Sequence, residues 1–458
     1  MNTGRVSETS TAEQSVVLSG FQQRALKLAA AQSETVAPVL QSVRERGADA
    51  FSRTPWPGRK VENWKYTSLQ ALRAFEGADW AESAKAEAAV ANAIDALPAL
   101  EATRLVFVDG QFQAAVSDSL PEGVTLFSQA DETAQGILEE YLGQITTATE
   151  GVATTPRRNL FAELNDAWLA EGLLLHVAAD ATLESPLYIV HISASGETTV
   201  ANQRLLLVLE RSASASVIEH FVSTSNQLDC FVNSLTEIEL RANARLHHTR
   251  LHNGSAQGSH IGSVHLSLQR DAVFQGFTMS AGSRLNRVDY QMNHRGSGAL
   301  VELDGIYLAR EKQLVDYHLT VEHEVPHCTT QEIFRGIVGG EARAVFNGKI
   351  HIHPDAQKTL AELHNRNLLT SSKAEIDTKP ELEIYADDVR CAHGATISQL
   401  DEDTMHYLRS RGVSQAAARM MLSYGFVNEL FERLPNEVLK EHLQNWLRQY
   451  FLEEMAGE

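Results

Sequence analysis

The amino-acid sequence predicts a mainly β protein, in which a right-handed parallel β-helix core lies between N-terminal and C-terminal α-helical regions. Three observations support this fold class. Apolar and polar residues alternate, as in strands, in many short segments between residues 166 and 396. A weak repeat recurs within that span, and helical spacing dominates on both sides of it. A β-sandwich, in which the repeat would be a coincidence, is the alternative fold.

The N-terminal part is predicted to contain helices and a linker. Residues 1–13 are polar and are expected to be disordered, whereas residues 14–165 are expected to form the helical region with its linker. A proline-rich segment, PWPG, interrupts the helical spacing. The aromatic and charged block KVENWKYT follows it, and we interpret this block as a packed loop that buries Trp64 and Tyr66.

The predicted core, residues 166–396, consists of strand-like segments that polar turns separate. Within it, only residues 357–369 are expected to be helical, so a sheet of alternating strands and helices is disfavoured. The repeat is a polar turn, an alanine and then alternating aliphatic residues, with spacings of 29, 28 and 27 residues. A period of roughly 20–50 residues is typical of a solenoid, in which each unit buries its apolar face only against the next. The repeat alanines are Ala215, Ala244, Ala272 and Ala299.

The C-terminal region, residues 397–458, is predicted to be a helical domain. Asp401 and Ser414 are expected to cap the starts of two helices, and Gly412 is expected to end the first of them. A third helix carries an amphipathic stripe of Leu, Trp and Tyr residues. Such a stripe usually packs into a core, but beside a solenoid it also makes a natural docking surface for a partner.

Composition excludes several classes of function. The chain has 458 residues, with 39 Lys and Arg against 59 Asp and Glu, and a net charge of −20 that would repel a phosphate backbone. No apolar segment approaches the roughly 20 residues of a membrane helix, and the N-terminus has no signal-peptide pattern. The three cysteines do not make a disulfide framework. We therefore expect a cytoplasmic protein with neither nucleic acid nor membrane as a partner.

One segment matches a catalytic motif literally. The run from His323 to His327 reads H-E-V-P-H, the H-E-x-x-H signature of zinc peptidases. That chemistry needs a helix, which Pro326 would break, and the preceding residues alternate like a strand. We interpret the segment as a histidine-lined turn and keep a zinc peptidase as an alternative. A polysaccharide-active β-helix enzyme is a second enzymatic alternative, although the sequence does not mark the pair of carboxylates that such an enzyme would need. The phosphate-binding glycine motifs are absent, so no ATP site is expected.

Cys391 and His393 are the candidate metal ligands. If their segment is extended, the two side chains share one face, with Cα atoms about 6.6 Å apart. Thiolate and imidazole are both metal ligands, but two ligands do not complete a site. The others would have to come from elsewhere in the fold or from another chain. A buried cysteine beside a hydrogen-bonded histidine is the alternative. Most of the remaining histidines are interpreted as structural, because alternation spreads them over both faces of the strands.

Several blocks of the sequence resemble the SufB/SufD proteins of the SUF iron–sulfur cluster assembly machinery, and the SufD branch in particular. The resemblance implies a β-helix core that pairs with a SufB-like protein, and C-terminal helices that bind a SufC-like ATPase. The chain itself would be a non-catalytic scaffold that binds no ATP, and a homodimer when alone is left open. The resembling blocks are ENWKYT at 62–67, PHC at 326–328, VFNGK at 345–349, NLL at 367–369, LEIYADDVRCAHGAT at 382–396 and YLRSRG at 407–412.

The same resemblance implies which residues hold the cluster. The interfacial cluster-ligand histidine of the family falls on His393, and its neighbouring cysteine falls on Cys391. A transient iron–sulfur cluster would then form at the subunit interface. SufB-like sequences typically have glutamate where Gly394 stands, and residues 360–380 contain no cysteine, so a SufB-type scaffold is the less favoured reading. A homodimeric structural protein that never binds metal is a third hypothesis.

Overall fold

The computed structural model describes most of the chain, and the segment predicted to be disordered, residues 1–13, lies outside the described part. None of the described helices is long and apolar enough to cross a membrane. The described residues are 18–32, 36–76, 87–150, 159–194 and 199–457.

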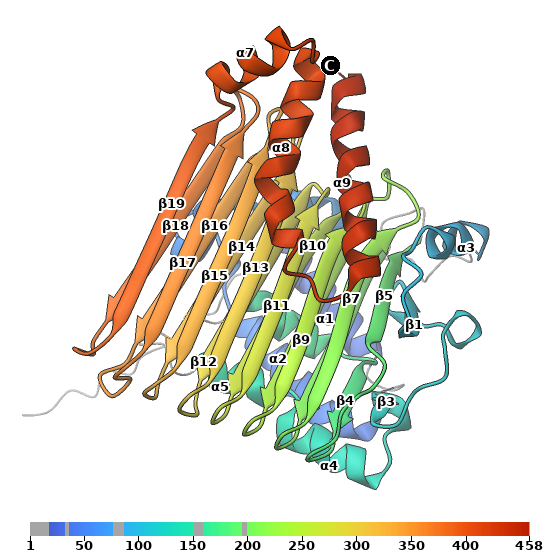
Figure 1. Ribbon diagram of the computed structural model, residues 1–458. Helices are drawn as coiled ribbons and strands as arrows, with labels where there is room; N and C mark the ends of the chain where they lie inside the picture. Colours follow the sequence, from blue (N-terminus) through green and yellow to red (C-terminus); the bar gives the residue numbers. More distant parts are fainter. Residues whose placement is uncertain (1–17, 33–35, 77–86, 151–158, 195–198, 458) are drawn as a thin grey trace, which may run out of the picture.

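Helices flank a large β region in the described part of the chain (Figure 1). The N-terminal α-helices are α1 (Gly20–Gln32), α2 (Pro38–Arg53), α3 (Glu87–Asp95), α4 (Glu132–Tyr141), α5 (Gln144–Glu150) and α6 (Leu160–Ala167). Short 3-10 helices are η2 (Glu62–Trp64), η3 (Leu69–Phe75), η4 (Ala114–Val116) and η5 (Phe127–Gln129). The C-terminal helices are α7 (Glu402–Ser410), α8 (Gln415–Phe431) and α9 (Glu437–Gly457).

The described strands form two sheets. Sheet A has ten strands: β1 (Thr103–Val108), β2 (Gln111–Phe112), β5 (Leu187–Ser193), β7 (Ser214–Ser223), β9 (Arg245–Asn253), β11 (Val273–Ala281), β13 (Leu300–Ala309), β15 (Thr329–Val338), β17 (Leu360–Leu369) and β19 (Arg390–Gln399). Sheet B has nine: β3 (Val124–Leu126), β4 (Leu173–Val177), β6 (Thr199–Leu209), β8 (Cys230–Leu240), β10 (Ser259–Leu268), β12 (Leu285–His294), β14 (Leu314–His323), β16 (Arg343–Ile352) and β18 (Glu375–Ile384).

The two sheets are the two sides of a β-solenoid. From β4 onward the chain changes sheet at every strand, and each strand pairs in parallel with the strand two further along, as β10 does with β12. This gives about 7 turns, so the predicted β-helix core with helical flanks is confirmed. Antiparallel neighbours, which a β-sandwich requires, occur only where β1 meets β2 and β3 meets β4 among the described strands.

The expected helix at residues 357–369 is wrong, because β17 occupies Leu360–Leu369. Its inward positions include Ala361 and Leu363, which join the solenoid core, while His364 and Arg366 are exposed. Pairing with β15 and β19 on both sides overrides the local helical spacing.

The alanine repeat marks one corner of the solenoid. Ala244, Ala272 and Ala299 each lie directly before a strand of sheet A and are buried in the core. In the first of these turns the equivalent residue is Ala213 and not Ala215, because Ser214 pairs with Arg245. Cys328 takes the same place before β15. In these turns the corner between the two sheets is filled by a small residue, which suits close packing.

The helical regions cover opposite faces of the solenoid (Figure 1). Apolar side chains of the N-terminal region, among them Phe161 and Trp168, pack on sheet B residues such as Phe231 and Ile261. Helices α8 and α9 pack on the outer face of sheet A. The predicted caps are confirmed: the side chain of Asp401 accepts a hydrogen bond from Thr404 N, and that of Ser414 accepts one from Ala417 N.

The KVENWKYT block lies along the outer face of sheet B. Trp64 is buried beneath the guanidinium of Arg287, which is 3.9 Å from the ring centroid, whereas Tyr66 is half-buried. The prediction of a packed loop therefore holds for Trp64 and only in part for Tyr66. Glu62, near the start of the block, forms an ion pair of 2.5 Å with Lys379 of β18, the last strand of sheet B.

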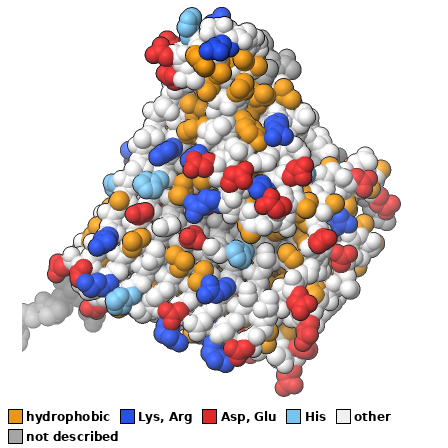
Figure 2. Space-filling model, in the orientation of Figure 1, with side chains coloured by type: hydrophobic (Ala, Val, Ile, Leu, Met, Phe, Trp, Pro, Cys, Tyr) orange, Lys and Arg blue, Asp and Glu red, His pale blue; other side chains and the backbone are white. Residues whose placement is uncertain are grey.

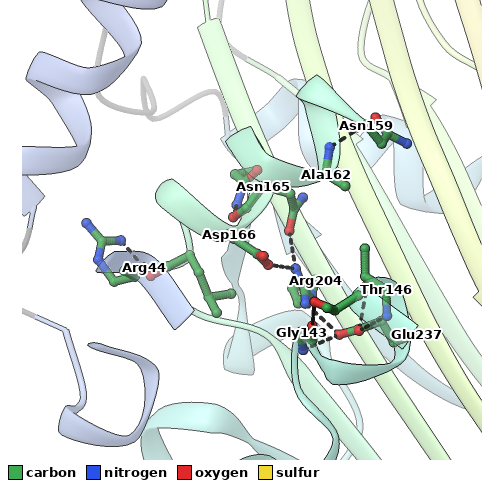
Figure 3. A network of polar contacts seen from close by, with 12 residues as sticks. Arg44, Gly143, Thr146, Asn159, Ala162, Asn165, Asp166, Arg204 and Glu237 are labelled. Atoms are coloured by element: carbon green, nitrogen blue, oxygen red, sulfur yellow. Dashed lines mark hydrogen bonds and ion pairs between the residues drawn. The ribbon is translucent and has the colours of Figure 1, made fainter. Parts of the chain in front are cut away.

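A buried polar network joins the N-terminal helices to sheet B (Figure 3). The fully buried guanidinium of Arg204 contacts Asp166 at 2.6 Å and Glu237 at 2.5 Å. Glu237 also accepts hydrogen bonds of 2.9 Å from the backbone N–H groups of Gly143 and Thr146. Burial alone would raise the pKa of Glu237, but Arg204 and these donors hold it below its ordinary value.

Replacing Arg204 with methionine is expected to destabilise the protein by about 3–5 kcal/mol, because Glu237 would be left buried without its cation. Arg211→Met is the matched control. Arg211 forms an ion pair with Asp180 in which the two side chains are 63% and 59% exposed, and such a pair is expected to contribute less than about 1 kcal/mol to stability. Urea unfolding midpoints of the two variants provide the comparison. Equal effects of both substitutions would contradict the importance of the buried network.

Candidate functional site

The solenoid ends at an open edge. Strands β18 and β19 are the last strands of sheets B and A, and no other described strand pairs with their outer sides. Interior strands such as β8 are buried throughout, whereas every residue of β18 and β19 is at least partly exposed. The candidate ligands predicted from the sequence lie on this edge.

Cys391 and His393 share one face of β19, as the sequence predicts. They pair in register with Ala361 and Leu363 of β17, two residues of the solenoid core. Their side chains therefore belong to the inward-facing row. Because no further turn covers this row, Cys391 is only half-buried and His393 is exposed. Burial raises the pKa of the Cys391 thiol.

The two candidate ligands do not make a complete site within the described part of the chain. Groups of at least three His, Cys, Asp or Glu side chains that are close enough to share an ion occur there, but neither Cys391 nor His393 belongs to one. A tetrahedral metal site needs four ligands. Whether further ligands come from elsewhere stays a prediction.

Apolar side chains also lie along the open edge. Ile376 and Leu382 of β18 and Val389 are only partly buried against the core. Three others are exposed: Ile384 by 42%, Ile397 by 47% and Tyr385 by 60%. Exposed apolar side chains on an unpaired sheet edge favour an interface with another chain.

The backbone of β19 also offers unpaired donors. The N–H of Arg390 donates to Thr359 O on the inner side, at 2.9 Å. Because successive N–H groups of a strand point to opposite sides, those of Cys391, His393, Ala395 and Ile397 point toward the open side. On β18 the N–H of Glu375 donates to Ala342 O, toward the neighbouring strand β16. By the same alternation the backbone nitrogen of Pro380 faces the open side, where proline has no N–H to donate. Strand β19 is therefore the better edge for pairing with another chain.

A buried carboxyl lies in the solenoid interior below His393. Glu332 of β15 pairs in register with Leu363, which pairs with His393, so these residues form one inward-facing column. Glu332 is completely buried, and neither carboxyl oxygen has a hydrogen-bond partner among the described residues. Burial raises the pKa of Glu332 to about 8. Sequence reasoning missed this residue, although it is an acidic residue at an inward position of an alternating strand.

Glu332 is expected to make stability fall as pH rises from about 4.5 to 8. The folded protein keeps the proton up to about pH 8, while the unfolded chain releases it near its ordinary value of 4.5. Each pKa unit corresponds to about 1.4 kcal/mol, so the loss over this window is several kcal/mol at most. Melting temperatures between pH 5 and pH 8 should therefore fall less for Glu332→Gln than for the wild type. Parallel curves for the two proteins would refute the assignment.

The zinc-peptidase motif does not form the arrangement that its chemistry needs. His323 is the last residue of β14, and His327 lies in a turn with a φ of 65°. The segment is thus a turn after a strand, as the proline predicts, and the two histidines are not on one face of a helix.

The chain is similar to known proteins over most of its length. Residues 191–426 match the family model "SUF system FeS cluster assembly, SufBD core domain", and residues 21–189 match "SufBD protein N-terminal region". The chain is 33% identical over 434 residues to an iron–sulfur cluster assembly SufBD family protein of Synechocystis sp., covering 92% of this chain and 93% of that protein.

Two further relatives carry the name of one branch of the family. The chain is 33% identical over 394 residues to the iron–sulfur cluster assembly protein SufD of Escherichia coli, which covers 85% of this chain and 88% of that protein. It is 26% identical over 283 residues to the protein of the same name from Bacillus subtilis, with 61% and 64% coverage.

Proposed function

Because the chain belongs to the SufBD family of SUF iron–sulfur cluster assembly proteins, we propose that it is a non-catalytic, SufD-type scaffold subunit that completes its cluster site with a SufB-like partner. One observation carries this proposal: Cys391 and His393 lie side by side on the open edge of the solenoid, without further ligands among the described residues. Thiolate and imidazole both suit iron, so a second chain that brings more ligands would complete a transient cluster site.

The SufB-like partner is proposed to pair with the open edge. Main-chain hydrogen bonds to β19 would extend sheet A across the interface, and the exposed Ile384, Tyr385 and Ile397 would be buried at the same time. Strand addition of this kind brings the partner's backbone within bonding distance of the strand that carries both ligands. Separation of the subunits would then take the cluster apart, which makes assembly sensitive to the geometry of the interface.

A SufC-like ATPase is proposed to bind the C-terminal helices, at the exposed side chains of α7 and α8. Helices α8 and α9 use their apolar residues on sheet A, but α7 buries none of its residues. Tyr407 on α7 is 56% exposed and Met421 on α8 is 49% exposed. Figure 2 shows hydrophobic side chains at the upper end of this face, where the C-terminal helices lie in Figure 1. ATP would be bound and hydrolysed by the partner, and a reducing cytoplasmic setting suits the three free cysteines.

Co-expression tests these proposals. The tagged chain is expected to retain both a SufB-like and a SufC-like protein through affinity purification and gel filtration. Tyr407→Glu should release the SufC-like protein and keep the SufB-like one, because a charge replaces an apolar contact. Val438→Glu, at an exposed position of α9, is the control that should keep both. If the double variant Tyr407→Glu, Met421→Glu still retained the SufC-like protein, the proposed docking site on these helices would be wrong.

A further inference from the structure

A second group of metal-ligand side chains is buried inside the solenoid. His294 ends β12 and His323 ends β14, and the two residues pair in register. They continue the inward rows of Met292 and Val321, which belong to the core. Cys328 lies at the neighbouring corner, in the place that Ala299 takes one turn earlier. All three side chains are completely buried.

These three residues lie close enough to share one ion. One ring nitrogen from each histidine and Sγ of Cys328 are all within 4.8 Å of one another. The two imidazole rings stack with their centroids 4.3 Å apart. Their Nε2 atoms contact the hydroxyl of Thr330, at 2.9 Å from His294 and 3.0 Å from His323.

The hydrogen bonding of the group is incomplete. The Nδ1 atoms of both histidines are buried and have no hydrogen-bond partner among the described residues. The thiol of Cys328 donates to carbonyl oxygens, at 3.4 Å to Gly296 and 3.6 Å to Pro326. Buried polar atoms nearly always have partners, so two orphaned nitrogens beside a thiol call for an explanation.

We propose that His294, His323 and Cys328 bind a single transition-metal ion of the Zn²⁺ class. Neutral imidazole and thiolate are ligands that such ions take, and three protein ligands leave the fourth position of the tetrahedron to a water molecule. Thr330 would accept the Nε2–H of each ring and so leave the Nδ1 lone pairs to the metal, the role that outer hydrogen-bond partners have in metal sites. Binding would draw the stacked rings apart and release the thiol proton.

This site differs from the proposed cluster site in place and in composition. Thr330 pairs in register with Ala361, which pairs with Cys391, so the buried group lies two turns below the open edge. At about 4.8 Å per turn, the separation is about 10 Å. All its ligands come from one chain, so binding needs no partner. The ion would fix the solenoid corner that supports β19.

Metal titration of the isolated full-length chain tests the inference. The reduced protein is stripped with EDTA under anaerobic conditions and titrated with Co²⁺, a spectroscopic probe for zinc sites. We expect one equivalent to bind with a thiolate-to-cobalt absorption band in the near ultraviolet, and Zn²⁺ to displace it and raise the melting temperature. Cys328→Ala should abolish the band and weaken binding at least tenfold. This variant should fold, because alanine stands at the equivalent corner in other turns.

Three controls separate this site from others. His294→Gln should also abolish the band, whereas Cys391→Ala should keep it. His351→Gln should keep it too, because His351 and His353 hydrogen-bond to Glu322 in a separate group. A wild-type chain that takes up no Co²⁺, or a Cys328→Ala chain that binds as the wild type does, would overturn the inference. So would loss of the band in Cys391→Ala, and none of these results depends on cluster assembly with a partner.

Discussion

A complex that contains His393→Ala is expected to assemble iron–sulfur clusters at least about 10–100-fold more slowly than the wild-type complex. Loss of an outer hydrogen-bond partner already costs a metal site about this much, and His393 is proposed to be a direct ligand. The residue is exposed on the last strand, so its truncation should leave the fold and the pairing of subunits unchanged. Cluster formation is followed by visible absorption during anaerobic supply of iron and sulfide.

His364→Ala is the matched control for this experiment. His364 is also an exposed histidine, one turn below on β17, but it pairs with Gly394 and faces away from the solenoid interior. Its truncation should leave cluster assembly unchanged. Cys391→Ala then decides whether the thiol is a second ligand, because a ligand would show a loss similar to that of His393→Ala. Normal assembly by the His393→Ala complex would remove the proposed role of this histidine.

Ala395→Pro is expected to weaken association with the SufB-like partner by about 10–100-fold. The N–H of Ala395 points toward the open side of β19, so proline removes a donor for the partner without breaking a bond to β17. A carbonyl oxygen of the partner that is left without a donor costs about 1–3 kcal/mol of binding free energy. The proline ring also keeps the partner strand from approaching β19 closely. Dissociation constants from analytical ultracentrifugation or surface plasmon resonance measure the effect.

The control at the same position is Ala395→Gly, which keeps the N–H and should pair nearly as well as the wild type. The melting temperature of isolated Ala395→Pro should stay close to that of the wild-type chain, since no intrachain hydrogen bond is lost. Unchanged affinity of Ala395→Pro would mean that the partner does not pair with this edge of sheet A.

The fold could be predicted because its signals repeat along the sequence. Alternation marks many of the strands, and the alanines recur because successive solenoid turns bury a small residue at the same corner. The helix expected at residues 357–369 fails for the opposite reason. Its spacing is a local signal, whereas β17 owes its conformation to hydrogen bonds with β15 and β19, which are distant in sequence.

The sites show the same division between local and distant signals. Cys391 and His393 could be paired from the sequence because they are two residues apart on one strand. From the sequence, His294 is counted among the structural histidines and His323 is placed in a histidine-lined turn, yet the two residues face each other across one solenoid turn. Their separation of 29 residues equals one of the spacings of the alanine repeat, so applying that period to the histidines would have found them. Nothing local marks the open edge, because exposure depends on where the last turn ends.

The most direct test of the proposed function is anaerobic iron and sulfide reconstitution of this chain with and without its SufB-like partner, followed by gel filtration and measurement of bound iron and sulfide. We expect the isolated chain, whether monomer or homodimer, to lose its cluster on the column. The complex should retain a cluster, and the complex with His393→Ala should not. A cluster held equally well by the isolated chain, or retained by the His393→Ala complex, would contradict a site that this chain completes only with a partner.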